Sequence, residues 1–234
     1  MPPLPSHPRA VVFDLDGTLV DAYAAIHESI GVVLEAFGRP PITRDETRRM
    51  VGHGLEVLVE KAVGKENVAE GVRLFRERYE RVGLESSRLL PGADLVTRRL
   101  FERGVRLAIA SNKPARFTRP LLESFGLAGR FGFVAGPDDG FPPKPAPHMV
   151  LMALATLSVP ARDAVFVGDM PIDVATARAA QLSIVALPSG SATRKELEAC
   201  SPDAIVENLH RPHQPLSKRS DDGLQHQIAR PLRV

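Results

Sequence analysis

From Val105 onward, short apolar runs alternate with amphipathic helical patterns, and one further apolar run stands near the start of the chain. Such alternation is typical of a parallel sheet flanked by helices. The expected strands are Ala10–Phe13, Val105–Ala110, Phe131–Ala135, Ala164–Val167, Ser183–Leu187 and Ala204–Val206, and helices are expected to begin near Pro114, Ala146, Pro171 and Thr193. We therefore predict an α/β fold with a doubly wound, mostly parallel sheet.

Between Asp21 and about Arg88 the pattern changes to helix after helix, with no strand. The apolar stripes are Tyr23, Ile26, Ile30, Val33, Leu34 and Phe37, then Leu55, Leu58, Val59 and Ala62, then Val72, Phe75, Tyr79 and Val82. Their spacing predicts a small helical bundle. We predict a catalytic core of residues 1–20 and 88–209, an inserted all-helical cap of residues 21–87 that acts as a lid, and a tail of residues 210–234.

Arginines crowd the stretch from Arg73 to Arg81 and raise the question of an anion site. Glu77 and Arg81 have the spacing of a favourable helical pair, and so do Arg76 and Glu80. We interpret the stretch as a solvated helix face rather than a substrate clamp.

Two carboxylates follow the first expected strand, in the segment Asp14–Asp21. Asp14 and Asp16 share a face of an extended chain, and Gly17 allows a sharp turn, so both side chains can reach one small site. Open α/β sheets bind ligands at the carboxyl ends of their strands. Two acids so close repel each other unless a cation binds them. Taken alone, the segment is either an acidic turn or a cation site.

Polar side chains also follow the later strands. Ser111 and Asn112 open a helix whose N–H groups can bind phosphate oxygens, and Lys144 stands among prolines. Asp169 follows another strand, with Asp173 four residues on. Each residue has an ordinary alternative: Ser111 or Asn112 as a helix cap, Lys144 as a loop lysine, and Asp173 as a helix N-terminal acid. Their common location favours a phosphoryl site with Asp14, Asp16 and Asp169 as ligands for Mg²⁺.

Composition narrows the functional classes. The chain has 234 residues and a formal net charge of +2. The segment 210–234 holds five Lys or Arg and two Asp, so the remainder, with 25 basic and 26 acidic residues, is nearly neutral. This argues against a nucleic-acid partner, and no apolar stretch is long enough for a membrane span. With a single cysteine, Cys200, and no signal peptide, we expect a cytoplasmic protein. We predict that the basic tail is disordered.

Four motifs in this order closely resemble the haloacid dehalogenase superfamily, and within it the phosphoglycolate phosphatases with a helical cap. They are DLDGTLVD at 14–21, SNKP at 111–114, KPAP at 144–147 and GDMPID at 168–173. The resemblance implies that Asp14 is a nucleophile that forms an aspartyl-phosphate and that Asp16 is the general acid and base. It further implies that the Asp14 carboxylate, the Asp16 carbonyl and Asp169 hold Mg²⁺, with Asp173 in support, while Ser111 and Lys144 neutralise the phosphoryl oxygens.

Two departures and two alternatives remain. Gln181 stands where the family usually has a glycine at a helix end, and residues 135–139 differ from the expected Gly-Gly-Asp. Dehalogenases and phosphonatases lack the second aspartate, so the presence of Asp16 favours hydrolysis of a small phosphomonoester, with 2-phosphoglycolate as one candidate. A sugar phosphomutase and a catalytically silent binding protein are the alternatives. By the same resemblance, the cap turn Val51–Leu55 reaches the site, and His53 either contacts the substrate or faces solvent. The sequence leaves the oligomeric state open.

Overall fold

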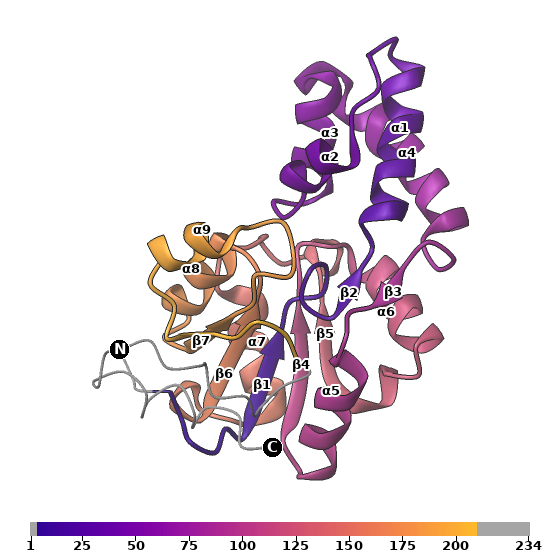
Figure 1. Cartoon of the computed structure of the whole chain (residues 1–234). Coiled ribbons are helices and arrows are strands. Elements are labelled where there is room, and N and C mark those ends of the chain that lie inside the picture. The colour runs from indigo at the N-terminus through magenta and orange to yellow at the C-terminus, as the bar shows by residue number, and fades with distance from the viewer. Residues whose placement is uncertain (1–3, 210–234) are drawn as a thin grey trace.

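A computed structural model describes residues 4–209, and within them a six-stranded parallel sheet forms the centre of the fold (Figure 1). Its strand order is β5-β4-β1-β6-β7-β8. The strands are β1 (Ala10–Phe13), β4 (Arg106–Ala110), β5 (Phe131–Ala135), β6 (Ala164–Gly168), β7 (Ser183–Ala186) and β8 (Ala204–Ile205). This confirms the predicted doubly wound sheet, and the strand bounds differ from the expected ones by only a residue or so.

Successive residues of β1 pack on opposite faces of the sheet, as the period of an extended chain requires. Val11 and Phe13 belong to the same apolar cluster as α5 (Ala93–Glu102) and α6 (Ala115–Ser124). Val12 lies in a second cluster with α7 (His148–Leu157) and α8 (Pro171–Ala179). Both faces of β1 are therefore covered, which explains why its sequence is apolar throughout rather than alternating.

The chain leaves the sheet after β1 and forms a helical lobe, residues 23–82, which stands beyond the carboxyl ends of the strands (Figure 1). Its helices are α1 (Tyr23–Ala36), α2 (Arg44–Met50), α3 (Leu55–Val63) and α4 (Val68–Val82). Buried residues of the predicted stripes, such as Ile30, Leu58 and Phe75, make its core. The lobe is thus the predicted insertion after the acidic turn.

Two short strands, which the sequence patterns did not reveal, connect the lobe to the core. β2 (Val20–Asp21) pairs antiparallel with β3 (Arg88–Leu89). These strands reach the two ends of the interval from Asp21 to Arg88, and residues 22–87 contain no strand, as expected. Two-residue strands carry too little periodicity for detection from sequence. α2 and α5 were not singled out either, and the short α9 (Arg194–Ala199) follows Thr193 as expected.

The structure explains two local features of the sequence. Thr43 caps α2 by accepting a hydrogen bond from the Glu46 N–H, while the Glu46 carboxylate accepts one from the Thr43 N–H. Gln181 has φ 58°, the left-handed conformation that a glycine adopts at low cost after a helix. The residue that departs from the family pattern therefore does occupy the strained position.

Arg73 and Arg81 lie on the exposed face of α4, whereas Arg76 and Arg78 are half-buried. Arg73 pairs with Glu70 at 2.6 Å and with Glu77 at 3.2 Å, and the predicted Glu77–Arg81 pair forms at 3.0 Å. Arg76 contacts Glu56 of α3, at 3.3 Å, instead of the expected Glu80. These pairs support the interpretation of a solvated face.

No helix of residues 4–209 is long and apolar enough to cross a membrane. The tail of residues 210–234, for which disorder was predicted, lies outside the described residues.

Candidate active site

The turn after β1 brings Asp14 and Asp16 to the carboxyl edge of the sheet. The Asp14 N–H still donates to the Val167 carbonyl at 2.9 Å, so this residue continues the line of the strand. Gly17 then turns the chain with φ 84°, and its N–H donates to the Val20 carbonyl at 2.8 Å. A side chain here would be strained and would meet the Asp169 carboxylate, which explains the glycine. Asp14 is 6% exposed, so little of its surface is accessible to solvent.

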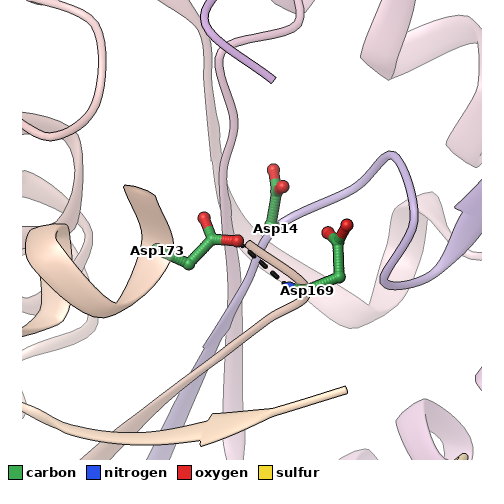
Figure 2. A group of neighbouring side chains, drawn as sticks. All are labelled: Asp14, Asp169 and Asp173. Carbon is green, nitrogen blue, oxygen red and sulfur yellow. Dashed lines mark hydrogen bonds between the residues drawn. The ribbon is translucent and has the colours of Figure 1, made fainter. Parts of the chain in front are cut away.

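Asp169 and Asp173 approach Asp14 from the neighbouring strand β6 and the start of α8 (Figure 2). The three carboxylates each offer an oxygen within 4.8 Å of the others. Asp169 accepts from the Thr18 hydroxyl at 3.1 Å and from the Ser191 N–H at 3.2 Å. The trio gathers because β1 and β6 are adjacent parallel strands that end at the same edge.

One carboxylate oxygen of Asp173 accepts hydrogen bonds from the backbone. It accepts from the N–H groups of Asp169, at 3.1 Å, and Met170, at 3.0 Å, and the first of these bonds is the dashed line in Figure 2. The other oxygen lies 2.6 Å from the Lys144 ammonium. Asp173 is thereby held between the backbone and Lys144, and its support of a metal ion stays a prediction.

Lys144 is the cation at the centre of this cluster. Its ammonium lies 2.9 Å from Asp14 Oδ1, and its side chain is 1% exposed. Asn112 holds the loop in place: its side-chain carbonyl accepts from the Lys144 N–H at 2.7 Å, and its amide donates to the Lys144 carbonyl at 3.2 Å. Burial alone lowers the pKa of Lys144, but Asp14 and Asp173 outweigh it, so the pKa lies above its ordinary value. Lys144 is therefore charged.

The cluster suits a divalent cation. When Asp14, Asp169 and Asp173 are ionised, Lys144 leaves a net charge of −2 in a buried place. Burial and the neighbouring acids raise the pKa of Asp169 well above its usual value, and Asp14 Oδ1, although close to Lys144, has no partner in hydrogen-bond geometry among the described residues. Buried negative charge of this kind is costly without compensation, and hard oxygen ligands are those that Mg²⁺ prefers. The residues present therefore fit Mg²⁺.

Asp16 pairs with a second lysine, Lys113, which belongs to the motif SNKP but had no predicted role. The Lys113 ammonium lies 2.9 Å and 3.3 Å from the two carboxylate oxygens of Asp16. It also lies 4.5 Å from the centre of the Tyr79 ring, which belongs to α4 of the lobe. Burial raises the pKa of Asp16 while Lys113 works to lower it, and the net direction is upward. Only the position of Lys113 beside Ser111 and Asn112 could have pointed to it.

A pocket opens between these groups and the lobe. Asp14, Asp16, Ser111, Asn112 and Lys113 line one side of it. The cap turn lines another side through Val51, Gly52, Gly54 and Leu55. The Asn112 amide donates to the Gly52 carbonyl at 3.0 Å, so the turn touches the motif that bears Ser111, as the resemblance implied.

The predicted site residues thus fall into three groups. Asp14, Asp16, Ser111 and Lys144 come together with Asp169 and Asp173. Asn112 lines the pocket, but its side-chain amide is engaged by Gly52 and Lys144, so a phosphate contact of Asn112 stays a prediction and would use its backbone N–H. The exposed His53 is not part of the pocket wall, and its contact with a substrate also stays a prediction.

Comparison with known proteins places this arrangement in a family. The model of the family "Haloacid dehalogenase-like hydrolase" matches residues 11–187. The chain is 33% identical over 211 residues to phosphoglycolate phosphatase 1 of Pseudomonas aeruginosa, which covers 86% of this chain and 77% of the relative. It is also 33% identical over 205 residues to a phosphoglycolate phosphatase of Yersinia pseudotuberculosis, covering 85% and 88%. A candidate haloacid dehalogenase-like hydrolase of Bacteroides fragilis has the same fold, with a TM-score of 0.82 at 26% identity and coverage of 87% and 98%.

Proposed function

We propose that this chain, which belongs to the haloacid dehalogenase-like hydrolase family, is a Mg²⁺-dependent phosphatase that forms an aspartyl-phosphate on Asp14. It is a phosphoric monoester hydrolase. The observation that carries the mechanism is the pair of carboxylates, Asp14 and Asp16, each beside its own buried lysine in one pocket. Their other neighbours differ, because Asp14 lies with Asp169 and Asp173 whereas Lys113, the partner of Asp16, lies under the Tyr79 ring. Two acids with different neighbours can take two different roles.

Asp14 is the nucleophile and Asp16 the acid. A carboxylate oxygen of Asp14 bonds to phosphorus as the bond from phosphorus to the ester oxygen breaks, and Asp16 gives its proton to that oxygen. Asp16 then takes a proton from water, which attacks the same phosphorus and frees phosphate and Asp14. The raised pKa of Asp16, caused by burial, favours the protonated form that the first step needs.

The other residues of the site bind the phosphoryl group, hold the metal ion, or keep these residues in place. Lys144 and the Ser111 hydroxyl contact the phosphoryl oxygens, and Lys144 also limits the repulsion between Asp14 and the incoming phosphate. Asp14, the Asp16 carbonyl and Asp169 hold Mg²⁺, which supplies further positive charge to the phosphoryl group when bound. Asp173 keeps Lys144 and the backbone of Asp169 in place.

The substrate is a small phosphomonoester, and 2-phosphoglycolate is the first candidate because both relatives described above carry its name. Residues 21–87 act as a cap, whose turn at Gly52 closes the pocket against Asn112. His53 at this turn is a candidate for substrate contact, and the cytoplasmic location remains a prediction.

Replacement of Asp14 by Asn tests the mechanism. We expect Asp14→Asn to lower Mg²⁺-dependent phosphate release by about 10⁴-fold or more, because the nucleophile is lost. Phosphate release from p-nitrophenyl phosphate and from 2-phosphoglycolate measures this. The matched control is Asp45→Asn, which changes an exposed aspartate of α2.

Mass spectrometry of acid-quenched wild-type enzyme provides the second measurement, with a phosphoryl group expected on Asp14. Full activity of Asp14→Asn, or a phosphoryl group on another residue, would overturn the mechanism. A wild-type enzyme that releases no phosphate from any phosphomonoester would overturn the function itself.

A further inference from the structure

The alcohol part of the substrate must lie beside Asp16, if the proposed function holds. Asp16 protonates the ester oxygen, so the first atoms of the leaving group are held against its carboxylate. Lys113 is the neighbour of Asp16 on the pocket wall, with its ammonium 2.9 Å from Asp16 Oδ2. Lys113 is therefore among the first groups that the leaving group meets.

Lys113 is unusual among the residues that line the pocket. No other lysine or arginine among the described residues belongs to this wall. Its side chain is 5% exposed, and Tyr79 covers it with its ring face. Beyond it, the wall is formed by apolar side chains, namely Ile26, Leu55, Leu58, Phe75 and Phe117. A negatively charged leaving group can therefore be neutralised by Lys113 and by no other side chain of this wall.

Tyr79 offers a second polar group at the same place. It is 3% exposed and lines the pocket. Its hydroxyl makes no hydrogen bond of normal geometry within residues 4–209, although Lys113 and Ser87 lie close to it. A buried hydroxyl without a partner costs free energy that a ligand can return. The phenol comes from α4 of the cap and Lys113 comes from the core, so a ligand held by both would join the two parts.

We propose that Lys113, with the hydroxyl of Tyr79, binds a carboxylate on the leaving group, so that the enzyme selects phosphate esters of short hydroxy acids. In 2-phosphoglycolate one methylene separates the ester oxygen from the carboxyl carbon, so the carboxylate oxygens lie within about 4 Å of the ester oxygen. A carboxylate at this distance from the ester oxygen can contact the Lys113 ammonium, because that ammonium already contacts Asp16. An ammonium has three N–H donors, so Lys113 can serve Asp16 and a ligand carboxylate together.

Three esters of similar size test the proposal in the wild-type enzyme with Mg²⁺: 2-phosphoglycolate, ethyl phosphate and 2-aminoethyl phosphate. At the end of the leaving group, 2-phosphoglycolate carries a carboxylate, ethyl phosphate carries no charge, and 2-aminoethyl phosphate carries an ammonium group. We expect kcat/KM for 2-phosphoglycolate to exceed that for ethyl phosphate by about 10- to 100-fold, the range of a hydrogen bond to a charged group. The cationic ester should be the poorest substrate.

Substitutions then assign the preference to its residues. Lys113→Met should reduce the ratio of kcat/KM between 2-phosphoglycolate and ethyl phosphate to nearly one, mostly through KM, and Lys113→Arg should restore part of it. Tyr79→Phe, which keeps the ring, should lower the ratio by a smaller factor. Lys195→Met, at an exposed lysine of α9, is the charge-matched control, and thermal unfolding checks that each variant is folded.

The outcomes separate the inference from the proposed function. A wild-type enzyme that hydrolyses ethyl phosphate as well as 2-phosphoglycolate would remain a phosphatase but would overturn the carboxylate site. An unchanged ratio in Lys113→Met would also overturn it. So would rates that increase along a series of longer alkyl phosphates, which would assign the pocket to apolar leaving groups.

Discussion

The carboxyl edge of the sheet and the outer face of α4 both carry many charges, but they use them differently. At the edge, Lys144 is 1% exposed and lies between Asp14 and Asp173, which come from two other segments of the chain. On α4, Arg73 is 58% exposed and pairs with Glu70 and Glu77 of its own helix. The first arrangement needs the whole fold, whereas the second needs only one helix.

This difference shows which charged residues indicate a functional site. Exposed pairs along a helix gain little, because water competes for both partners. Burying three carboxylates around one lysine is costly, and a protein keeps such a group only where it is compensated or used. The buried cluster is therefore the candidate site, although the segment Arg73–Arg81 is richer in charge along the sequence.

Loss of Lys144 should produce the largest change in this comparison. We expect Lys144→Met to lower kcat by at least about 10³-fold, because a cation next to the phosphoryl group is removed. In metal-free buffer, the free energy of unfolding at pH 7.5 should fall by roughly 3–5 kcal/mol, since Asp14 and Asp173 lose their buried partner. Urea unfolding and phosphate release measure the two effects. Stability and activity equal to those of the wild type would show that the cluster does not differ from a surface pair.

Mg²⁺ should compensate the remaining negative charge at the edge. We expect saturating Mg²⁺, at about 100 times its dissociation constant, to stabilise the wild type by roughly 2.7 kcal/mol, and Asp169→Asn to lose most of this gain. Thermal unfolding with Mg²⁺ or with EDTA measures it without any substrate. Equal stabilisation of Asp45→Asn and Asp169→Asn would contradict a site at the carboxylate trio.

The stabilisation by Mg²⁺ should also depend on pH, and the direction of this dependence follows from the pKa of Asp173. Burial raises the pKa of Asp173 to about 6, and Asp14 adds to this, although Lys144 opposes both. A carboxyl with a raised pKa in the folded state contributes stability below its unfolded pKa, and that contribution is lost as pH rises to about 6. Mg²⁺ needs ionised carboxylates, so its stabilisation should be larger at pH 8 than at pH 5. An effect that decreases with rising pH would contradict this.

The residues at the carboxyl edge of the sheet could be predicted from the sequence because most of them directly follow a strand. Each apolar run predicts a strand, parallel strands end at one edge, and Asp14, Ser111 and Asp169 follow strand ends directly. Lys144 was found from its proline-rich loop and its motif. These inferences need the order of the elements but no knowledge of how the lobe is placed.

The pair of Lys113 and Asp16 could not be found in this way. Lys113 does not directly follow the end of β4, as Ser111 does, and the Tyr79 ring that covers Lys113 comes from the lobe. Tyr79 fitted an apolar stripe and was assigned to the bundle core, which is only half of its role. The engagement of the Asn112 amide by Gly52 depends on the same placement of the lobe against the core.

The outer face of α4 should give the smallest effect and thereby complete the comparison. Arg73→Met removes the arginine that bridges Glu70 and Glu77, yet we expect no measurable change in the urea midpoint or in kcat/KM for 2-phosphoglycolate. All three side chains are more than half exposed, so water replaces the lost contacts at little cost. The result should hold from low to high salt. A decrease in kcat/KM that depends on salt would instead show that the arginines of α4 steer an anionic substrate, and the contrast between the two regions would then fail.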